Sequence, residues 1–345
     1  MRTVKLILCM GLVCVLAWQL SAEPVLYAEA IRQGIDCCLY QLIPSLYAFL
    51  ILSGFLIRTN LHVLLGRPLR GVARRVLHLT EGEATVFLLS QLCGYPVGAS
   101  MLAMLVKTGE LATARAARLS LYCFGGGAGF FLALAGGGLF GSPLPGLLLW
   151  CANLLTNCLL AVLLRPSLPA QQDAEKPAFC PSMDALLQAT AQAARTLLAM
   201  CSMILLFAVA ATACLQLLPV RHGTWLEPCL FSLLDVSRLG CFPHGCYPAL
   251  PLLAGLCGFG GFCVYLQLRQ LAAGWFPKLT FLLVRCAAGC ICAGACRLLM
   301  PMFLRHAAVS TMQGAYHDTA QQRPLLSILL IFMTFLLLSK KPLDN

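Results

Sequence analysis

The sequence predicts an all-α polytopic membrane protein built from two inverted-topology Gate-type repeats, with about eight spanning helices. Of its 345 residues, 60% are hydrophobic and 11% are charged, whereas about a quarter of the residues of a soluble protein are charged. The mean hydropathy is +0.84. The apolar residues form long runs, and glycine-rich segments at 91–100 and 256–262 interrupt two of them, one in each half of the chain.

The first 40 residues predict a membrane helix followed by an interfacial helix. Residues 4–20 are an apolar run that is just long enough to cross a bilayer. Arg2 and Lys5 precede the uncharged stretch 6–20, as in a signal peptide, but the residues before Ser21 and Ala22 are too large for a good cleavage site. We therefore expect a retained first helix. Residues 24–40 carry charges at helical spacing, which is typical of an amphipathic helix in the membrane interface.

The region 41–165 is predicted to hold the first repeat and one extra span. It opens with the apolar run 42–57 and continues through an arginine-rich segment, 58–75. Basic loops of this kind lie on the cytoplasmic side. Residues 84–106 then contain the first break, which we expect to form a helical hairpin or a broken helix.

The first break is predicted from Gly94, Pro96 and Gly98. Proline removes an amide donor and clashes with the preceding turn, and glycine adds backbone freedom, so the three residues cannot continue a straight helix. At membrane depth such a break is tolerated only where it faces protein or a wet cavity. Transporters use breaks of this kind to expose free backbone groups to a substrate.

Two further spans complete the first half. The run 119–140 contains two dense glycine clusters, which predict either close helix packing or an unwound, substrate-facing segment. The run 143–164 adds an odd crossing. It is followed by a polar linker, 166–195, so the second half starts from the opposite side of the membrane.

The second repeat is predicted over residues 196–304, and a C-terminal helix and tail over 305–345. The repeat opens with a span at 197–218, holds the second break within 248–271, and closes with a span that carries Arg285. The inverted orientation brings the two breaks together near the midplane.

Charge and cysteine placement exclude several classes of protein. The net charge is +11, but the basic residues lie between apolar runs, where the positive-inside rule explains them without nucleic acid. The 20 cysteines lie mostly inside apolar runs and behave as small hydrophobic residues. The densest group, residues 286–296, has no histidine or acid beside it, so we expect neither a metal nor a cofactor. Zinc-protease and phosphate-binding motifs are absent from the sequence, and we expect no enzymatic activity.

The candidate site lies at the two breaks. The predicted substrate-binding residues are Gln91, Gly94, Tyr95, Pro96, Gly98, Gly125, Gly126, Gly258, Phe259, Gly260, Gly261, Gln267 and Arg285. Arg285 is the most interior cation, and the alternatives for it are a functional role or snorkelling to the interface. The two glutamines either donate to a carboxylate or satisfy the unwound backbone. Tyr95 and Phe259 either sandwich an aromatic ring or only pack beside the breaks.

Several segments in order along residues 30–300 resemble a known family. They are 34–46, 93–99 with 109–111, 141–165, 226–228 and 258–262. On these segments the chain resembles the sporulation integral membrane protein YlbJ (SpoVV) family, whose members carry a nucleoside-recognition or Gate domain. The resemblance implies a protein of the cell membrane or outer forespore membrane of an endospore-forming bacterium. It also implies a role in moving dipicolinic acid from the mother cell toward the forespore.

Dipicolinate is a small aromatic dianion. A site for it requires backbone amides at helix N-termini, an arginine and an apolar slot for the ring. Family members carry asparagines after the first break, and residues 122–127 of this chain have a glycine run in their place. Two alternatives therefore remain, a transporter of a nucleoside or another small solute and a non-transporting sporulation assembly protein. No paired acids lie within the predicted spans, which favours facilitated movement without a coupling ion. The expected partners are the solute and the lipid bilayer.

Overall fold

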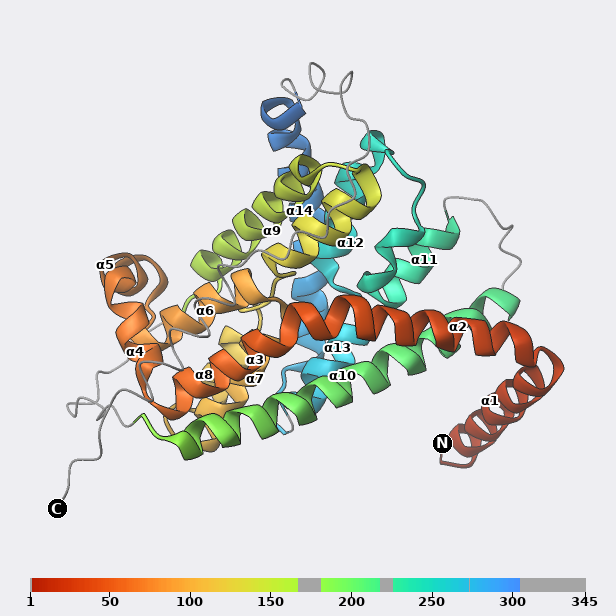
Figure 1. The fold of residues 1–345 in the computed structure, drawn as a ribbon, viewed down its shortest axis with the longest axis horizontal. Helices are drawn as coiled ribbons and strands as arrows, with labels where there is room; N and C mark the ends of the chain where they lie inside the picture. Colours follow the sequence, from red (N-terminus) through yellow and green to blue (C-terminus); the bar gives the residue numbers. More distant parts are fainter. Residues whose placement is uncertain (1, 167–180, 218–225, 273, 305–345) are drawn as a thin grey trace. The chain divides into compact units, whose positions relative to one another are not determined.

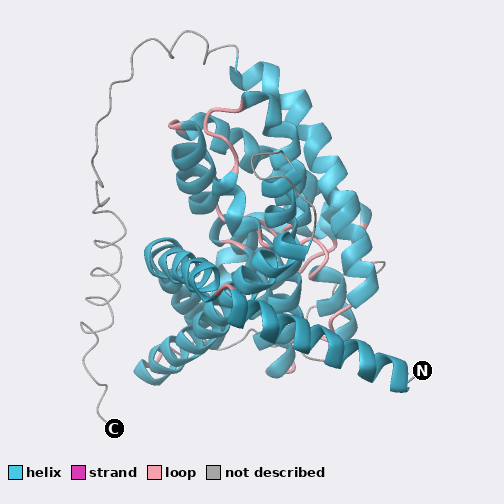
Figure 2. Cartoon of the chain, turned by 90° about the vertical axis from the view of Figure 1, so that its right-hand side faces the viewer, coloured by secondary structure: helices cyan, strands magenta, loops and turns pink. Residues whose placement is uncertain are grey.

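A computed structural model of the chain describes residues 2–166, 181–217, 226–272 and 274–304. Within these ranges the regular elements are helices and no strand is present (Figure 2). Five described segments are long and apolar enough to cross a membrane: Pro24–Arg58, Pro143–Leu163, Met183–Leu217, Tyr247–Leu271 and Lys278–Phe303. The chain is therefore an all-α, multi-pass integral membrane protein. The predicted C-terminal helix and tail, 305–345, lie outside the described residues.

The N-terminal region forms two helical segments. Helix α1 (Arg2–Ala22) covers the predicted first span, and its apolar part Val13–Ala22 is shorter than the five candidate spans. The next segment is continuous from Pro24 to Arg58 and comprises α2 (Pro24–Cys37), the π-helical turn η1 (Cys38–Leu42) and α3 (Ile43–Arg58). The predicted interfacial helix 24–40 and the apolar run 42–57 are thus one span.

A π-helical turn explains why the helix continues through Pro44. Proline cannot donate to the carbonyl four residues earlier, so an ordinary helix would break or kink there. The wider turn of η1 absorbs the mismatch, and the Ser45 hydroxyl donates to the carbonyls of Gln41 at 2.6 Å and Leu42 at 3.1 Å. The segment therefore bends where the sequence indicated an end.

The first break divides α6 (Glu81–Cys93) from α7 (Tyr95–Lys107), as predicted. Gly94 joins the two helices at φ +107°, a backbone conformation that favours glycine. The chain turns back on itself at this break, so that Gly98 of α7 lies against Ser90 of α6. A Cβ added to Gly98 would lie only 2.6 Å from the Cβ of Ser90. The arginine-rich segment before the break folds as short helices: α4 (Leu61–Gly66), η2 (Arg67–Leu69), α5 (Arg70–Val72) and η3 (Ala73–Leu77).

The start of α6 is fixed by a cap and an ion pair. Thr80 and Glu83 form a capping box, in which the Thr80 amide donates to Glu83 Oε2 at 2.8 Å. The Arg115 guanidinium forms an ion pair with Glu83 and also donates to the His78 carbonyl at 2.7 Å. A capping box alone stabilises a helix by about 1 kcal/mol, and the ion pair anchors the first arm of the hairpin to α8 (Thr113–Leu119).

The run 119–140 does not form one continuous helix, and its first part is unwound. Helix α8 ends at Leu119, residues 120–127 are not helical, and the π-helix η4 (Phe130–Gly138) follows. Close backbone approach is the physical reason, since a Cβ added to Gly127 would lie 2.8 Å from the Cys93 carbonyl carbon. The glycine run therefore allows the unwound segment to lie against the first break.

The structure describes seven helical elements in the second half. The first six are α10 (Met183–Leu217), α11 (Leu226–Leu234), η5 (Val236–Cys241) and η6 (Tyr247–Ala249), then α12 (Leu250–Phe259) and α13 (Gly261–Leu271) on either side of the second break. The last described helix, α14 (Lys278–Leu304), follows them. Helix α10 begins inside the predicted linker 166–195. Its early alanines are small enough to be buried against α3: a Cβ added to Gly54 would lie 3.3 Å from the Cβ of the buried Ala189.

The spans pack in two groups. Figure 1 shows α10 running alongside α2 and α3, while α14 packs against α12 and α9 (Pro143–Leu163). Small residues allow the close contact of α12 with α14, as a Cβ added to Gly258 would lie 2.7 Å from Cys292 Cβ. The two breaks meet between these groups, where the Tyr95 hydroxyl donates to the Cys257 carbonyl at 3.1 Å.

Candidate functional site

A cavity of about 580 Å³ lies at the tip of the first break. Its wall is mostly apolar, and its polar groups come from the bent first span, the first break, the start of η5 and α13. The lining residues that matter here are Cys37, Gln41, Ser45, Gly94, Tyr95, Pro96, Phe130, Leu134, Met200, Asp235, Ser237 and Gln267. The volume is within the range of small-molecule sites.

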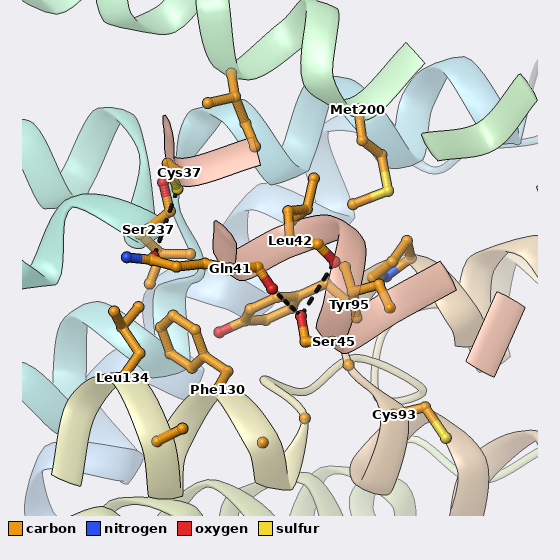
Figure 3. Close-up of a pocket in the computed structure, with 18 of the residues that line it drawn as sticks. Cys37, Gln41, Leu42, Ser45, Cys93, Tyr95, Phe130, Leu134, Met200 and Ser237 are labelled. Carbon is orange, nitrogen blue, oxygen red and sulfur yellow. Dashed lines mark hydrogen bonds between the residues drawn. The ribbon is translucent and has the colours of Figure 1, made fainter. Parts of the chain in front are cut away.

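Figure 3 shows how three elements enclose this cavity. Phe130 and Leu134 of η4 lie across from Gln41 and Ser45 of the bent first span, and Met200 projects from α10 on another side. The cavity is therefore an apolar slot with a few polar groups, which suits a flat aromatic solute with polar substituents.

Arg285 of α14 forms the centre of a second, buried group. Its side chain is 1% exposed, so the guanidinium does not snorkel to the membrane interface. Its Nη2 donates to the Leu121 carbonyl at 2.7 Å, and its Nη1 donates to the Gly258 carbonyl at 3.4 Å. One carbonyl belongs to the unwound segment and the other to the second break, so Arg285 joins the two.

One amide side chain, that of Asn157, lies next to Arg285, and two others contact Asn157. Asn157 Oδ1 lies 3.5 Å from both terminal guanidinium nitrogens, the outer limit of a hydrogen bond. The Asn157 amide donates to Gln91 Oε1 at 2.9 Å and to Asn153 Oδ1 at 3.1 Å. Among the described residues, Arg285 Nε and Asn153 Nδ2 have no hydrogen-bond partner although both are buried. The buried group thus has unpaired donors, and buried unpaired donors are costly.

A chain of aromatic contacts leads from the cavity to Arg285. The Tyr95 ring lies 4.6 Å from the Phe124 ring, and the Arg285 guanidinium carbon lies 4.5 Å from the Phe124 centroid. Gly260, at φ +88°, makes room for these rings, because its added Cβ would lie 2.4 Å from Phe124 Cζ. Tyr95 and Phe124 therefore connect the cavity with the buried cation.

The structure divides the predicted site residues into three sets. Those that line the cavity are Gly94, Tyr95, Pro96 and Gln267. Those that belong to the buried group or contact it are Gln91, Gly125, Gly258, Gly260 and Arg285. The others make packing contacts: Gly98 with Ser90, Gly126 with the Phe131 ring, Gly261 with the Val236 backbone, and Phe259 with Phe262.

Tyr95 and Phe259 each pack against another aromatic ring. The Tyr95 ring pairs with Phe124, and the Phe259 ring pairs with Phe262 at 5.4 Å. The two glutamines also differ, because Gln91 belongs to the buried amide group whereas the Gln267 amide donates to Cys263 Sγ at 3.3 Å.

Three residues of the site were not predicted from the sequence. Asn153 and Asn157 are four positions apart in an otherwise apolar span, a spacing that places them on one helix face. That pattern was a usable signal. Asp235 is a single acid after the short apolar helix α11, and nothing in its sequence neighbourhood points to the cavity.

Asp235 is the acid of the cavity wall. Its side chain is 4% exposed, and its Oδ1 accepts from the Ser237 amide at 3.0 Å. Its Oδ2 has no hydrogen-bond partner in the part of the chain that the structure describes. Burial raises the pKa of this carboxyl, and the hydrogen bond from the Ser237 amide and the charge of Arg238 oppose the shift only in part.

The cysteines on α14 do not converge on one point. Cys286 and Cys290 are exposed, whereas Cys292 and Cys296 are buried. Within the described ranges no group of three or more histidine, cysteine or acidic side chains is placed to hold a metal ion.

Comparison of the chain with protein-family models, with curated proteins and with solved structures yields no match. The class of solute proposed below therefore depends on the geometry of the cavity and of the buried group around Arg285.

Proposed function

We propose that this chain is a secondary transporter or facilitator of a small anionic aromatic solute. The observation that carries the proposal is Arg285, a buried cation with no acidic partner within ion-pair distance among the described residues. Ionisable residues in the interior of a membrane protein mark substrate pathways, or they pair with one another or with backbone carbonyls. Arg285 donates to two backbone carbonyls, which satisfy hydrogen bonds but carry no negative charge. An anionic solute would supply the counter-charge that these carbonyls do not.

The donors around Arg285 support an anion with oxygen acceptors. A carboxylate accepts several hydrogen bonds at once and pairs with the planar guanidinium in a bidentate arrangement. Arg285 Nε and Asn153 Nδ2 are unpaired, and both are donors. A bound carboxylate would satisfy these groups and offset the cost of keeping Arg285 buried.

The aromatic contacts support a flat ring in the solute. Tyr95 and Phe130 belong to the cavity wall, and their ring centroids are 6.5 Å apart. Phe124 continues this aromatic surface toward Arg285. A solute that joins an aromatic ring to a carboxylate fits both the slot and the cation.

Dipicolinic acid is the first candidate, and the reason is the resemblance to the sporulation membrane family. On this proposal the protein lies in the cell membrane or the outer forespore membrane and moves dipicolinate from the mother cell toward the forespore. Residues 122–127 contain a glycine run where family members carry asparagines. The space left by the absent side chains is occupied by the amide side chains of Gln91 and Asn153. A Cβ added to Gly125 would lie 2.7 Å from Gln91 Oε1 and 3.3 Å from Asn153 Oδ1.

The proposal includes the finer architecture of two inverted Gate-type repeats with about eight spans. Supporting it, each half contains one glycine break, at Gly94 and at Gly260, and both glycines have positive φ. The hydrogen bond from Tyr95 to Cys257 joins the two breaks, as expected where repeat halves meet at a substrate site.

A nucleoside is the second candidate solute. Gln91, Asn153 and Asn157 form a neutral amide cluster, and amides of this kind recognise uncharged polar solutes such as nucleosides. The two candidates differ in their need for the charge of Arg285, so its substitution separates them.

Uptake into proteoliposomes tests the proposal. We expect labelled dipicolinate to enter vesicles that contain the purified protein and to be displaced by unlabelled dipicolinate but not by nucleosides. Uptake of nucleosides alone would favour the second candidate. Absence of uptake of either solute by folded protein would contradict transport and favour the membrane assembly role.

A further inference from the structure

Asp235, the acid in the cavity wall, has no part in the proposed binding of the anion at Arg285, and its negative charge would weaken that binding. Asp235 lines the cavity into which an anionic solute would enter. An ionised Asp235 would repel that solute in a region of low dielectric, where the repulsion is larger than in water. Protonation of Asp235 removes the repulsion, so the proton and the anion each favour binding of the other.

Among the described residues, no base lies within ion-pair distance of Asp235. The titratable groups that face it are Cys37 of α2, Cys38 of η1, Cys263 of α13 and Arg238 of η5. The three thiols carry no positive charge. Arg238 is directed elsewhere, since its Nη1 donates to Gln33 Oε1 at 3.2 Å and it forms no ion pair within 4.0 Å among the described residues.

The two oxygens of the carboxyl have different environments. Oδ1 accepts from the Ser237 amide, which fixes the side chain at the start of η5. Oδ2 is buried without a partner, and it is the atom that carries a proton when the carboxyl is neutral. A neutral carboxyl at this position avoids the large cost of a buried, unpaired charge.

We propose that Asp235 is a proton-binding site that couples the movement of the anionic solute to the movement of a proton in the same direction. A proton binds Oδ2 from the side on which the solute enters, the solute anion binds next to the neutral carboxyl, and both leave on the other side. No other reactant is consumed. The proposal rests on the proposed transport of an anion and replaces facilitated movement without a coupling ion.

Substitution of Asp235 by asparagine is the central perturbation. Asparagine keeps the oxygen that accepts from the Ser237 amide and cannot ionise, so it mimics the protonated acid. We expect solute uptake by the wild type to rise several-fold, by at most about tenfold per pH unit, as the external pH falls from about 8 to about 6, where a carboxylic solute stays ionised. Uptake by Asp235→Asn should be independent of pH in this range.

Asp184→Asn is the matched control, because Asp184 is an exposed acid in the first turn of α10. This variant should keep the pH dependence of the wild type. The proposal is overturned if Asp235→Asn retains the pH profile of the wild type, or if uptake follows a sodium gradient and ignores a proton gradient.

Carbodiimide labelling tests the proton site without any transport. Dicyclohexylcarbodiimide is an apolar reagent that attacks protonated carboxyls in apolar surroundings, and peptide mass spectrometry identifies the labelled residue. We expect Asp235 to be labelled near neutral pH and to lose labelling as the pH rises. Failure to label Asp235 at about pH 6 would overturn the inference. If the wild type moves no solute at any pH, the transport proposal fails, and labelling alone decides whether Asp235 holds a proton.

Discussion

Substitution of Arg285 by glutamine should weaken the binding of an anionic solute far more than that of a neutral one. A unit charge about 4 Å from the guanidinium interacts by about 4 kcal/mol at an effective dielectric constant of about 20. Part of this interaction energy does not appear as binding energy, because a bound solute competes for donors that already have partners. Arg285 donates to the Leu121 carbonyl at 2.7 Å and to the Gly258 carbonyl at 3.4 Å. We therefore expect a loss of about 2 to 3 kcal/mol, which is about a 30- to 150-fold increase in Kd.

Equilibrium binding to purified protein measures this effect. Dipicolinate and its uncharged diamide have nearly the same shape, so the diamide reports any general damage to the site. The Kd of the diamide should change by less than about threefold, since its binding does not need the charge. Arg285→Lys keeps the charge but loses the planar fork, and its Kd for dipicolinate should lie between those of the wild type and Arg285→Gln.

Arg297→Gln is the control on the same helix, because Arg297 is exposed. Its affinity for dipicolinate should equal that of the wild type. The reasoning is refuted if Arg285→Gln binds dipicolinate within about threefold of the wild type, or if both solutes lose affinity equally while the thermal midpoint is unchanged.

Three other predictions concern stability, each measured as a thermal midpoint. Tyr95→Phe removes the hydrogen bond to the backbone carbonyl of the second break and should cost about 1 to 2 kcal/mol. Gly260→Ala forces a Cβ to within 2.4 Å of Phe124 at φ +88° and should cost about 1 to 3 kcal/mol, whereas Gly294→Ala, with open space around it, should cost nothing. Burial lowers the pKa of His62, and nearby acceptors offset this only in part. The unfolded chain therefore binds more protons, so stability should fall as the pH drops below about 6.5, and His62→Gln should flatten this fall.

The positions of both breaks could be predicted from the sequence. Gly94 and Gly260 each lie where a helix ends and another begins, because glycine and proline impose backbone limits that tertiary contacts do not override. The interior position of Arg285 could also be predicted, since a cation deep in an apolar run has few structural explanations.

Other features depend on tertiary contacts that a single sequence does not show. The run 119–140 has the composition of a span, yet residues 120–127 unwind because Gly127 lies against the first break. The sequence predicts separate segments at 24–40 and 42–57, but a π-helical turn joins them into one continuous helix. Asp235 is far from both breaks in the sequence, and only the packing of α11 and α13 beside the bent first span brings it to the cavity.

A structure determined with dipicolinate bound would test the central claim most directly. We expect density for one carboxylate within hydrogen-bond distance of Arg285 and Asn153, with the ring against Phe124 and with the Tyr95 ring displaced from its present contact. Solute density confined to the protein surface, with Arg285 still donating to the Leu121 and Gly258 carbonyls, would contradict an anion site at the meeting point of the two breaks.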